Sequence, residues 1–222
     1  MTIGLSLEEV AREVALDLAD GSYVNLGIGL PTRVAAFVPA GREVVFHSEN
    51  GIYGTGPPAP AGAEDPDLVD AGKQPVTLLA GGCYVSHADS FAAIRGGHLD
   101  VTVMGAYQVS VDGDLANWST GENIPAVGGA MDLVAGAKLV YVMTTHTTKD
   151  NHPKLVAECS LPLTGRSVVS RIYTDLGIFE IGDREFVAVG LALGMDLERV
   201  RSATGAPVIQ APGCVSLPRR SA

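Results

Sequence analysis

Residues 23–51 read YVNLGIGLPTRVAAFVPAGREVVFHSENG, and this stretch decides the fold that the sequence predicts. Its first residues, Tyr23 to Leu26, favour a strand that runs into a glycine-rich turn at 27–32. Val34 to Val38 favours a short helix, and Glu43 to Phe46 favours a second strand. A strand, a tight turn, a helix and another strand make the repeating unit of an α/β protein with a parallel sheet.

The flanking sequence continues this alternation. Ser6 and Glu9 form a capping-box pattern at the start of a helix that Gly21 is expected to end. Further strands are predicted at 76–79, 99–104 and 139–144, helices at 89–95, 128–134 and 196–200, and hairpins at 109–115 and 178–189. We therefore predict a single α/β domain over 1–222, with an open, largely parallel sheet flanked by helices and an irregular tail from about residue 206.

The second strand of the opening stretch ends in His47, Ser48, Glu49, Asn50 and Gly51. Functional sites of α/β folds usually lie at the carboxyl ends of strands, so Glu49 occupies a position where chemistry is expected. A Ser/His/Glu triad is a weaker interpretation, because neighbouring strand residues point to opposite faces. The remaining histidines show no metal-ligand spacing.

The glycine turn has an alternative interpretation as a dinucleotide-binding fingerprint. Gly27 and Gly29 stand in the right order, and Glu49 follows at the distance where a ribose-binding acid is sought. However, Pro31 stiffens the turn, and Thr32 replaces the small residue that lets helix and strand pack closely. The glycines could also simply turn the chain.

A long segment rich in glycine and proline follows Glu49. Between Gly51 and Gly72 the chain contains five glycines and four prolines, too many for regular structure. Long loops without secondary structure commonly cover functional sites. We predict that residues 51–72 form a loop over the site of Glu49.

Composition limits the possible partners. Hydrophobic residues make up 46% of the 222 residues and charged residues 18%, so we expect another subunit to cover part of the surface. The formal net charge is −10 without a Lys/Arg cluster, which argues against nucleic acid because phosphate backbones bind basic patches. A few local cations could still bind an anionic small molecule.

The three cysteines are Cys83, Cys159 and Cys214, without a CxxC pattern, so neither a disulfide nor a metal site is predicted. The first residues lack a basic segment that leads into an apolar one, and the chain has no apolar run of about 18 residues. We expect a cytoplasmic protein without a membrane span or signal peptide.

The segments discussed above, with several others, resemble the beta subunits of class I 3-oxoacid coenzyme A transferases. The resemblance extends from about residue 24 to 207 and is densest at 25–31, 48–51, 67–73, 90–98, 114–118 and 128–137. Its most specific element is Ser-Glu-Asn-Gly at 48–51. The resemblance implies an open α/β fold that is shared with sugar-phosphate isomerases.

The resemblance also implies roles for individual residues. It makes Glu49 the nucleophile, places Asn25, Gly128 and Gly129 at the oxyanion and thioester site, and requires an alpha subunit, in an expected α2β2 heterotetramer. Substrate or CoA contacts are expected at Gly27, Gly29, Ser48, Asn50, Gly51 and Lys73. For Lys73, the simpler interpretation is an exposed loop lysine. The resemblance further implies that coenzyme A is a substrate, that no cofactor is permanently bound, and that the enzyme acts in ketone body or aromatic catabolism.

The chemistry of a glutamate fits this role. Its carboxyl has a reference pKa near 4.3, so it is an anion at neutral pH and needs no partner base. Attack on an acyl-CoA would give an acyl-glutamyl anhydride and a thiolate, and thiolate return would give a glutamyl-CoA thioester. Such a ping-pong route needs fixed hydrogen-bond donors for the oxyanion and exclusion of water.

One segment departs from the family pattern. Between Trp118 and Gly128 the family usually has Pro-Gly-Lys with further basic character, whereas residues 119–127 read STGENIPAV. The hypothesis is that acid preference differs from that of acetoacetate/succinate enzymes, which rates with a panel of carboxylates would decide. Alternatives on the same fold are a CoA-ester or ring-opening hydrolase, and a non-catalytic partner subunit.

Overall fold

The structure is a computed structural model that describes residues 4–121 and 126–219. Its strands are β1 (Ser22–Leu26), β2 (Val44–Ser48), β3 (Ile52–Thr55), β4 (Leu78–Tyr84), β5 (Val101–Met104), β6 (Gln108–Ser110), β7 (Leu115–Ala116), β8 (Leu139–Met143), β9 (Leu155–Val156), β10 (Arg171–Tyr173), β11 (Gly177–Ile181), β12 (Phe186–Ala192) and β13 (Val208–Leu217). Its helices are α1 (Leu7–Leu16), the 3-10 helix η1 (Leu30–Phe37), α2 (His87–Arg95), α3 (Ala130–Gly136) and α4 (Leu197–Ala203).

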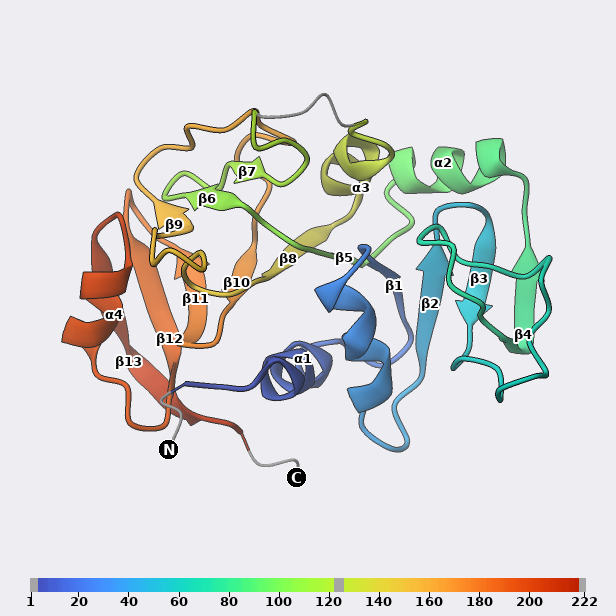
Figure 1. The fold of residues 1–222 in the computed structure, drawn as a ribbon, viewed down its shortest axis with the longest axis horizontal. Helices are drawn as coiled ribbons and strands as arrows, with labels where there is room; N and C mark the ends of the chain where they lie inside the picture. The colour runs from blue at the N-terminus through green and yellow to red at the C-terminus, as the bar shows by residue number, and fades with distance from the viewer. Residues whose placement is uncertain (1–3, 122–125, 220–222) are drawn as a thin grey trace.

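A ten-stranded sheet organises the molecule (Figure 1), in the order β13-β12-β11-β10-β8-β5-β1-β2-β3-β4. The five central strands from β10 to β2 are parallel to one another. Antiparallel pairs extend this centre on both sides, through β11 and β12 on one and through β3 and β4 on the other. The prediction of an open, largely parallel α/β sheet is confirmed.

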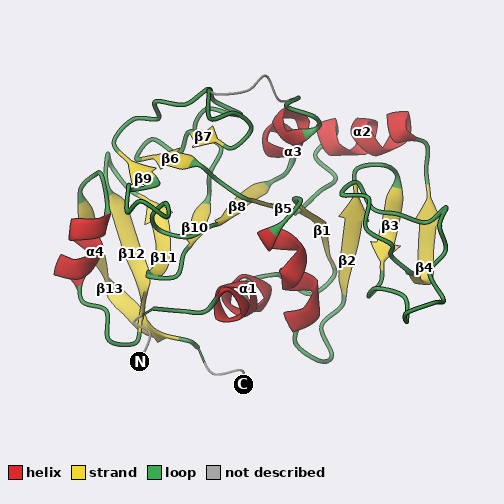
Figure 2. Ribbon diagram, in the orientation of Figure 1, coloured by secondary structure: helices red, strands yellow, loops and turns green. Residues whose placement is uncertain are grey.

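Helices pack on both faces of the sheet (Figure 2). Strand β8 illustrates why, because its residues alternate between two hydrophobic cores. Val140 and Val142 contribute to the core that includes residues of α2 and α3. Tyr141 and Met143 contribute to the core beneath α1 and η1. Both faces of the central strands are therefore buried, as is typical of parallel sheets.

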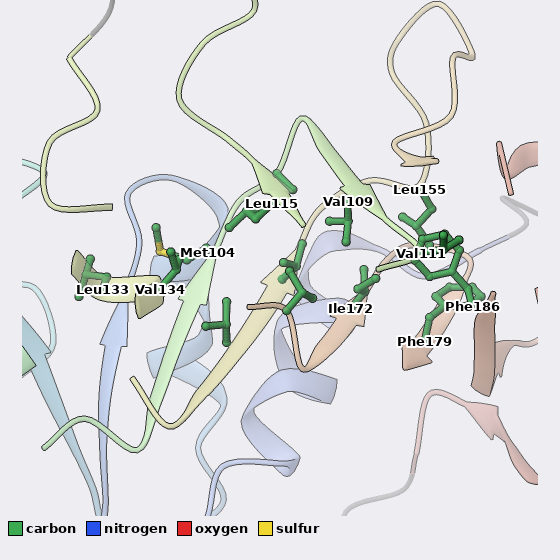
Figure 3. Close-up of a cluster of buried hydrophobic side chains, with 14 of the residues drawn as sticks. Met104, Val109, Val111, Leu115, Leu133, Val134, Leu155, Ile172, Phe179 and Phe186 are labelled. Atoms are coloured by element: carbon green, nitrogen blue, oxygen red, sulfur yellow. The ribbon is translucent and has the colours of Figure 1, made fainter. Parts of the chain in front are cut away.

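A second, three-stranded sheet with the order β7-β6-β9 covers part of the first core. Val109, Leu115 and Leu155 project from it and are fully buried. Figure 3 shows them gathered with Ile172 and Phe179 of the large sheet. This small sheet confirms the predicted hairpin at 109–115, since β6 pairs antiparallel with β7. The hairpin predicted at 178–189 is confirmed as β11 and β12.

The start of α1 also follows the sequence prediction. Glu9 N donates to Ser6 Oγ at 3.2 Å, and Ser6 N donates to Glu9 Oε2 at 2.7 Å, which completes the capping box. At the other end, Arg42 Nη1 donates to the carbonyl oxygens of Leu16 and Leu18 at 2.9 and 2.7 Å. A cation at this position satisfies carbonyls that lack helical partners.

Two local predictions are wrong. The segment 51–72 is not loop throughout, because it begins with β3, whose Gly54 allows a close approach to Gly82 of β4. The tail from about residue 206 is not irregular either, because residues 208–217 form β13. Pro212 and Gly213 conceal this strand in the sequence. An edge strand tolerates proline, and the register of β13 against β12 skips residues 211–214.

An ionic cluster attaches the end of the chain to α1. Arg219 Nε donates to Glu13 Oε2 at 2.5 Å, and Arg219 Nη1 donates to Asp17 Oδ1 at 2.7 Å. Glu13 is completely buried. Asp17 also accepts from Tyr173 Oη at 2.7 Å and from Arg171 Nη1 at 2.9 Å. Although burial alone raises the pKa of Asp17, the bonds from Arg219, Tyr173 and Arg171 lower it overall.

Removal of Arg219 should therefore be costly. In Arg219→Ala the buried Glu13 carboxylate loses its cation, and we expect the free energy of unfolding to fall by roughly 3 kcal/mol. Arg33→Ala is the matched control, because Arg33 pairs with Glu8 on the surface, where ion pairs contribute about 0–1 kcal/mol. Urea denaturation followed by circular dichroism measures both. Equal losses in the two variants would contradict the prediction.

Within the described ranges, no helix combines the length and the apolar character that crossing a membrane requires.

Candidate active site

Glu49 stands in a tight turn at the carboxyl end of β2. Gly51 N donates to Ser48 O at 2.9 Å and closes this turn. Gly51 has a φ of +111°, and a Cβ there would lie 2.3 Å from Val85 O, so this position requires glycine. The turn leaves Glu49 half-buried, facing a cavity of about 530 Å³. Gly51 thus shapes the backbone that presents the carboxylate.

The glycine pair before α3 lies against Glu49. A Cβ added at Gly129 would be 2.8 Å from Glu49 Oε2 and 2.7 Å from Phe91 Cζ. Gly128 has a φ of +58°, but a Cβ there would meet no atom within 4 Å. The N–H groups of both glycines donate no hydrogen bond within the described part of the chain. Close approach to the carboxylate therefore requires glycine at 129, whereas position 128 has open space.

Asn25 lines the same cavity, next to His47 of β2 and Thr102 of β5 in strand register. Its Nδ2 donates to His47 O at 3.2 Å and lies 3.3 Å from His47 Nδ1, while its Oδ1 accepts from Thr102 Oγ1 at 3.4 Å. Burial lowers the pKa of His47 to about 4, so the ring is neutral at pH 7. With Nδ1 as acceptor, His47 Nε2 donates to Ser90 Oγ at 2.9 Å.

This network bears on two predictions. The His47 ring bonds to Asn25 and Ser90 rather than to Ser48 or Glu49, so His47, Ser48 and Glu49 form no triad. Asn25 lies where the resemblance puts it, but both of its amide hydrogens are directed at His47. A role as oxyanion donor, which stays a prediction, would require Asn25 to exchange one of these bonds.

Ser48 and Asn50 fix the neighbouring loop instead of pointing freely at a ligand. Ser48 Oγ accepts from Ala71 N at 2.9 Å, and Asn50 Nδ2 donates to Val69 O at 2.8 Å. Ala71 lines the cavity. The later part of the segment 51–72 therefore reaches the site, as predicted for a covering loop.

The remaining predicted contacts differ in position. Gly27 lines the cavity, and a Cβ there would lie 3.0 Å from Val103 O, so its small size lets the turn approach β5. Gly29 has a φ of +93° and forms no part of the described cavity wall. Lys73 is exposed, has a φ of +61° and lies outside this wall as well. CoA binding by Gly29 and Lys73 stays a prediction.

The environment of Glu49 perturbs its acidity. Burial raises the pKa of the carboxyl above its ordinary value of 4.5, His87 opposes this rise through its charge, and Asp132 adds to it. His87 packs against Phe91 with ring centroids 4.6 Å apart and the rings tilted, and both residues line a second hollow that Glu49 and Gly129 also line. The carboxyl group is thus partly removed from water, and reduced hydration makes a carboxylate a stronger nucleophile.

These charges predict a pH dependence. If the anion of Glu49 reacts, the rate of acyl transfer should fall on the acid side through an apparent pKa above 4.5. His87→Gln removes a charge that lowers the pKa, so the acid limb should move to higher pH. Asp132→Asn removes a charge that raises it, so the limb should move to lower pH. Single-turnover rates against pH measure both, and shifts in the same direction would contradict the prediction.

Sequence reasoning missed several residues of the cavity wall. Tyr107, Asn117 and Trp118 line it, as do Thr144 and Lys154. Trp118 donates from Nε1 to Leu163 O at 3.2 Å. Lys154 stands alone before the apolar pair of β9, and an isolated lysine gives no recognisable signal in a sequence.

The fold and this cavity are typical of an α/β enzyme, with the candidate site at the carboxyl end of parallel strands. A family-wide sequence model described as Coenzyme A transferase matches residues 7–202. The chain belongs to the coenzyme A transferase family.

Individual relatives narrow this assignment. The beta-type chain of the 3-oxoadipate CoA-transferase of Acinetobacter baylyi is 52% identical over 209 residues, covering 93% of this chain and 96% of that protein. The beta-type chain of the succinyl-CoA:3-ketoacid coenzyme A transferase of Helicobacter pylori is 46% identical over 200 residues, covering 90% of this chain and 96% of that one. The predicted resemblance to the beta subunits of coenzyme A transferases is confirmed, and with it the class of enzyme.

A solved structure agrees on the fold. The acyl-CoA transferase YdiF of Escherichia coli O157:H7 has a TM-score of 0.76 at 17% identity and covers 98% of this chain. This chain spans only 45% of the length of that protein. At such low identity the likeness shows the fold alone.

Proposed function

We propose that this chain is the nucleophile-bearing subunit of a heteromeric CoA transferase that works through a glutamyl-CoA thioester at Glu49. It exchanges CoA between an acyl-CoA and a carboxylic acid of the 3-oxo class, together with an alpha-type subunit in an α2β2 assembly. The observation that carries the proposal is the Glu49 carboxylate packed against Gly129 at the wall of a cavity. The names of the relatives, which specify one subunit of such an enzyme and acids of the 3-oxo class, support it.

The reaction proceeds by four balanced attacks. The Glu49 carboxylate attacks the thioester carbonyl, so the C–S bond breaks and an acyl-glutamyl anhydride and a CoA thiolate result. The thiolate then attacks the glutamyl carbonyl, which releases the first acid and leaves the glutamyl-CoA thioester. A second carboxylate attacks this thioester and regenerates an anhydride, and the thiolate finally attacks its acyl carbonyl. Glu49 returns unchanged, and water takes no part.

The surroundings of Glu49 assist these steps. Each attack places negative charge on a carbonyl oxygen, and backbone N–H groups without other acceptors stabilise such an oxyanion. The N–H groups of Gly128 and Gly129 donate to no acceptor among the described residues, so both are available for this oxyanion. The loop that Ser48 and Asn50 attach beside the turn excludes water, which would otherwise hydrolyse the anhydride and the thioester.

The mass of the intact chain tests the proposal. The chain, assembled with its alpha subunit, is incubated with succinyl-CoA or acetoacetyl-CoA and analysed by mass spectrometry. We expect an adduct with the mass of CoA less water, mapped to Glu49 after proteolysis, and no adduct in Glu49→Gln. An intact complex that releases free CoA without an acceptor acid and never forms the adduct would indicate a hydrolase instead.

The acids exchanged depend on the rest of the cavity. Residues 122–125 of the unusual segment 119–127 lie outside the described residues, while Ala126 and Val127 line the cavity. A preference different from acetoacetate/succinate enzymes stays a prediction for this segment. Rates with a panel of carboxylates test it, and an ordinary acetoacetate/succinate preference would refute it.

A further inference from the structure

Lys154 is a charged residue of the cavity wall to which the proposed mechanism gives no role. It lies directly before β9 and lines the cavity that Glu49 also lines. Among the described lining residues, Glu49 is the one acidic side chain and Lys154 the one basic side chain. The cavity thus offers one carboxyl group, which reacts, and one amino group, which is free to bind.

Two threonines hold the ammonium group in place. Lys154 Nζ donates to Thr144 Oγ1 and to Thr145 Oγ1, both at 2.9 Å. Each hydroxyl in turn donates to a backbone carbonyl, Thr144 to Ala106 O at 3.1 Å and Thr145 to Thr147 O at 2.8 Å. The hydroxyl oxygens are therefore oriented as acceptors. An ammonium has three N–H donors, so the bonds to the two threonines use two of them and leave the third for a ligand.

Lys154 has no carboxylate partner in the described part of the chain, where none of the ion pairs includes it. The acid whose charge affects the pKa of Lys154 is Asp175. Asp175 Oδ1 already accepts a hydrogen bond from His146 N at 2.7 Å. Burial lowers the pKa of Lys154, and the charge of Asp175 opposes this effect. A partly desolvated ammonium without an anion is costly, so an anionic ligand would be stabilised there.

The sheet separates the two strand ends near which these groups lie. Glu49 follows β2, and Thr144, which accepts from the Lys154 ammonium, follows β8, with β1 and β5 between these strands. Three interstrand spacings of about 4.8 Å place the two strand ends roughly 14 Å apart. Both side chains line the same cavity, so a short carbon chain with an acidic group at each end has room between them.

We infer that Lys154 binds the second carboxylate of a dicarboxylic acid whose first carboxyl group reacts at Glu49. This inference rests on the proposed function and adds to it a residue that selects the acid. A phosphate of CoA is a poorer fit for this position. The cavity of about 530 Å³ has the size of a small-molecule pocket, and the pantetheine arm keeps the nucleotide far from the reacting thioester.

Matched acids test this role on the assembled enzyme. 3-Oxoadipate and 3-oxohexanoate differ only in a terminal carboxylate against a methyl group, as do succinate and butyrate. In Lys154→Met, kcat/KM for the diacids should fall roughly tenfold to a hundredfold, the value of one charge-assisted hydrogen bond, while the monoacids change little. Lys154→Arg should restore much of the diacid preference. Lys149→Met removes an exposed lysine outside the cavity wall. It should change kcat/KM neither for the diacids nor for the monoacids.

Two results would overturn the inference. Equal losses for diacids and monoacids in Lys154→Met would assign the residue a structural role, and an unchanged kcat/KM for both classes would exclude contact with the acid. If the wild-type complex transfers CoA to no acid, the proposed function fails, and calorimetry with succinate still decides the inference. Wild-type and Lys149→Met complexes should then bind succinate at least tenfold more tightly than Lys154→Met, and equal affinities would refute it.

Discussion

The Glu49→Gln enzyme, assembled with its partner, is expected to exchange CoA on the order of 10⁴-fold more slowly than wild type. Glutamine occupies the same space but has no anionic oxygen, so neither the anhydride nor the thioester can form. Glu49→Asp keeps the charge and moves it back by one methylene. A misplacement of about 1 Å costs roughly a hundredfold, so aspartate should retain more activity than glutamine.

The control for this experiment is Glu43→Gln, which removes an exposed carboxylate just before β2 and should leave turnover unchanged. Size-exclusion chromatography verifies that each variant still assembles. Full turnover in Glu49→Gln would favour a chain that only completes a site on its partner. Loss of turnover without loss of assembly, together with a missing CoA adduct, would establish the carboxylate as the reacting group.

Gly129→Ala is expected to lower the rate of adduct formation by about a hundredfold, because the new methyl group displaces the nucleophile. The added Cβ would lie 2.8 Å from Glu49 Oε2, closer than such contacts allow. Gly41→Ala is the control, since Gly41 lies outside the cavity wall, a Cβ there has open space and only its φ of +82° is strained. That strain is expected to cost about 1 kcal/mol of stability and little activity. Equal loss of activity in the two variants would contradict the prediction.

The same substitution also disturbs the core, and a second mutation separates the two effects. The Cβ at Gly129 would lie 2.7 Å from Phe91 Cζ, so overpacking should reduce stability by about 1–3 kcal/mol. Replacing Phe91 by leucine in the Gly129→Ala background relieves that contact but leaves the one with Glu49. We expect thermal stability to recover in part while adduct formation stays slow. Recovery of both would attribute the defect to packing alone.

The centre of the fold could be predicted from the sequence because its signals are local. Residues 23–51 alternate strand, turn and helix signals, and the structure has β1, η1 and β2 there. Strands toward the two ends of the sheet were harder to predict, because glycines and prolines obscure them. The three glycines at 51, 54 and 56 hid β3, which lies between β2 and β4. Pro212 with Gly213 hid β13, where the register skips. As an edge strand, β13 has one hydrogen-bonding neighbour, so it tolerates residues that a central strand excludes.

The candidate site could likewise be predicted only in part from the sequence. The position of Glu49 at a strand end follows from the sequence, and the roles of Asn25 and the glycine pair come from a family resemblance. No local pattern shows that Gly129 touches Glu49 or that the amide of Asn25 is occupied by His47. Such contacts depend on tertiary packing between distant segments. Lys154 was missed because only the fold brings it into the wall shared with Glu49.

The ionic cluster of Arg219, Glu13 and Asp17 has a consequence for biosynthesis. The acids of α1 leave the ribosome early, whereas their cation lies 206 and 202 residues further along the chain. Chains are synthesised at about 5–20 residues per second, so Arg219 is added on the order of ten seconds or more after Glu13 and Asp17. During that time burial of Glu13 is unfavourable, and the first helix should dock last. Nascent chains stalled before Arg219 should therefore be far more sensitive to protease near α1 than released chains.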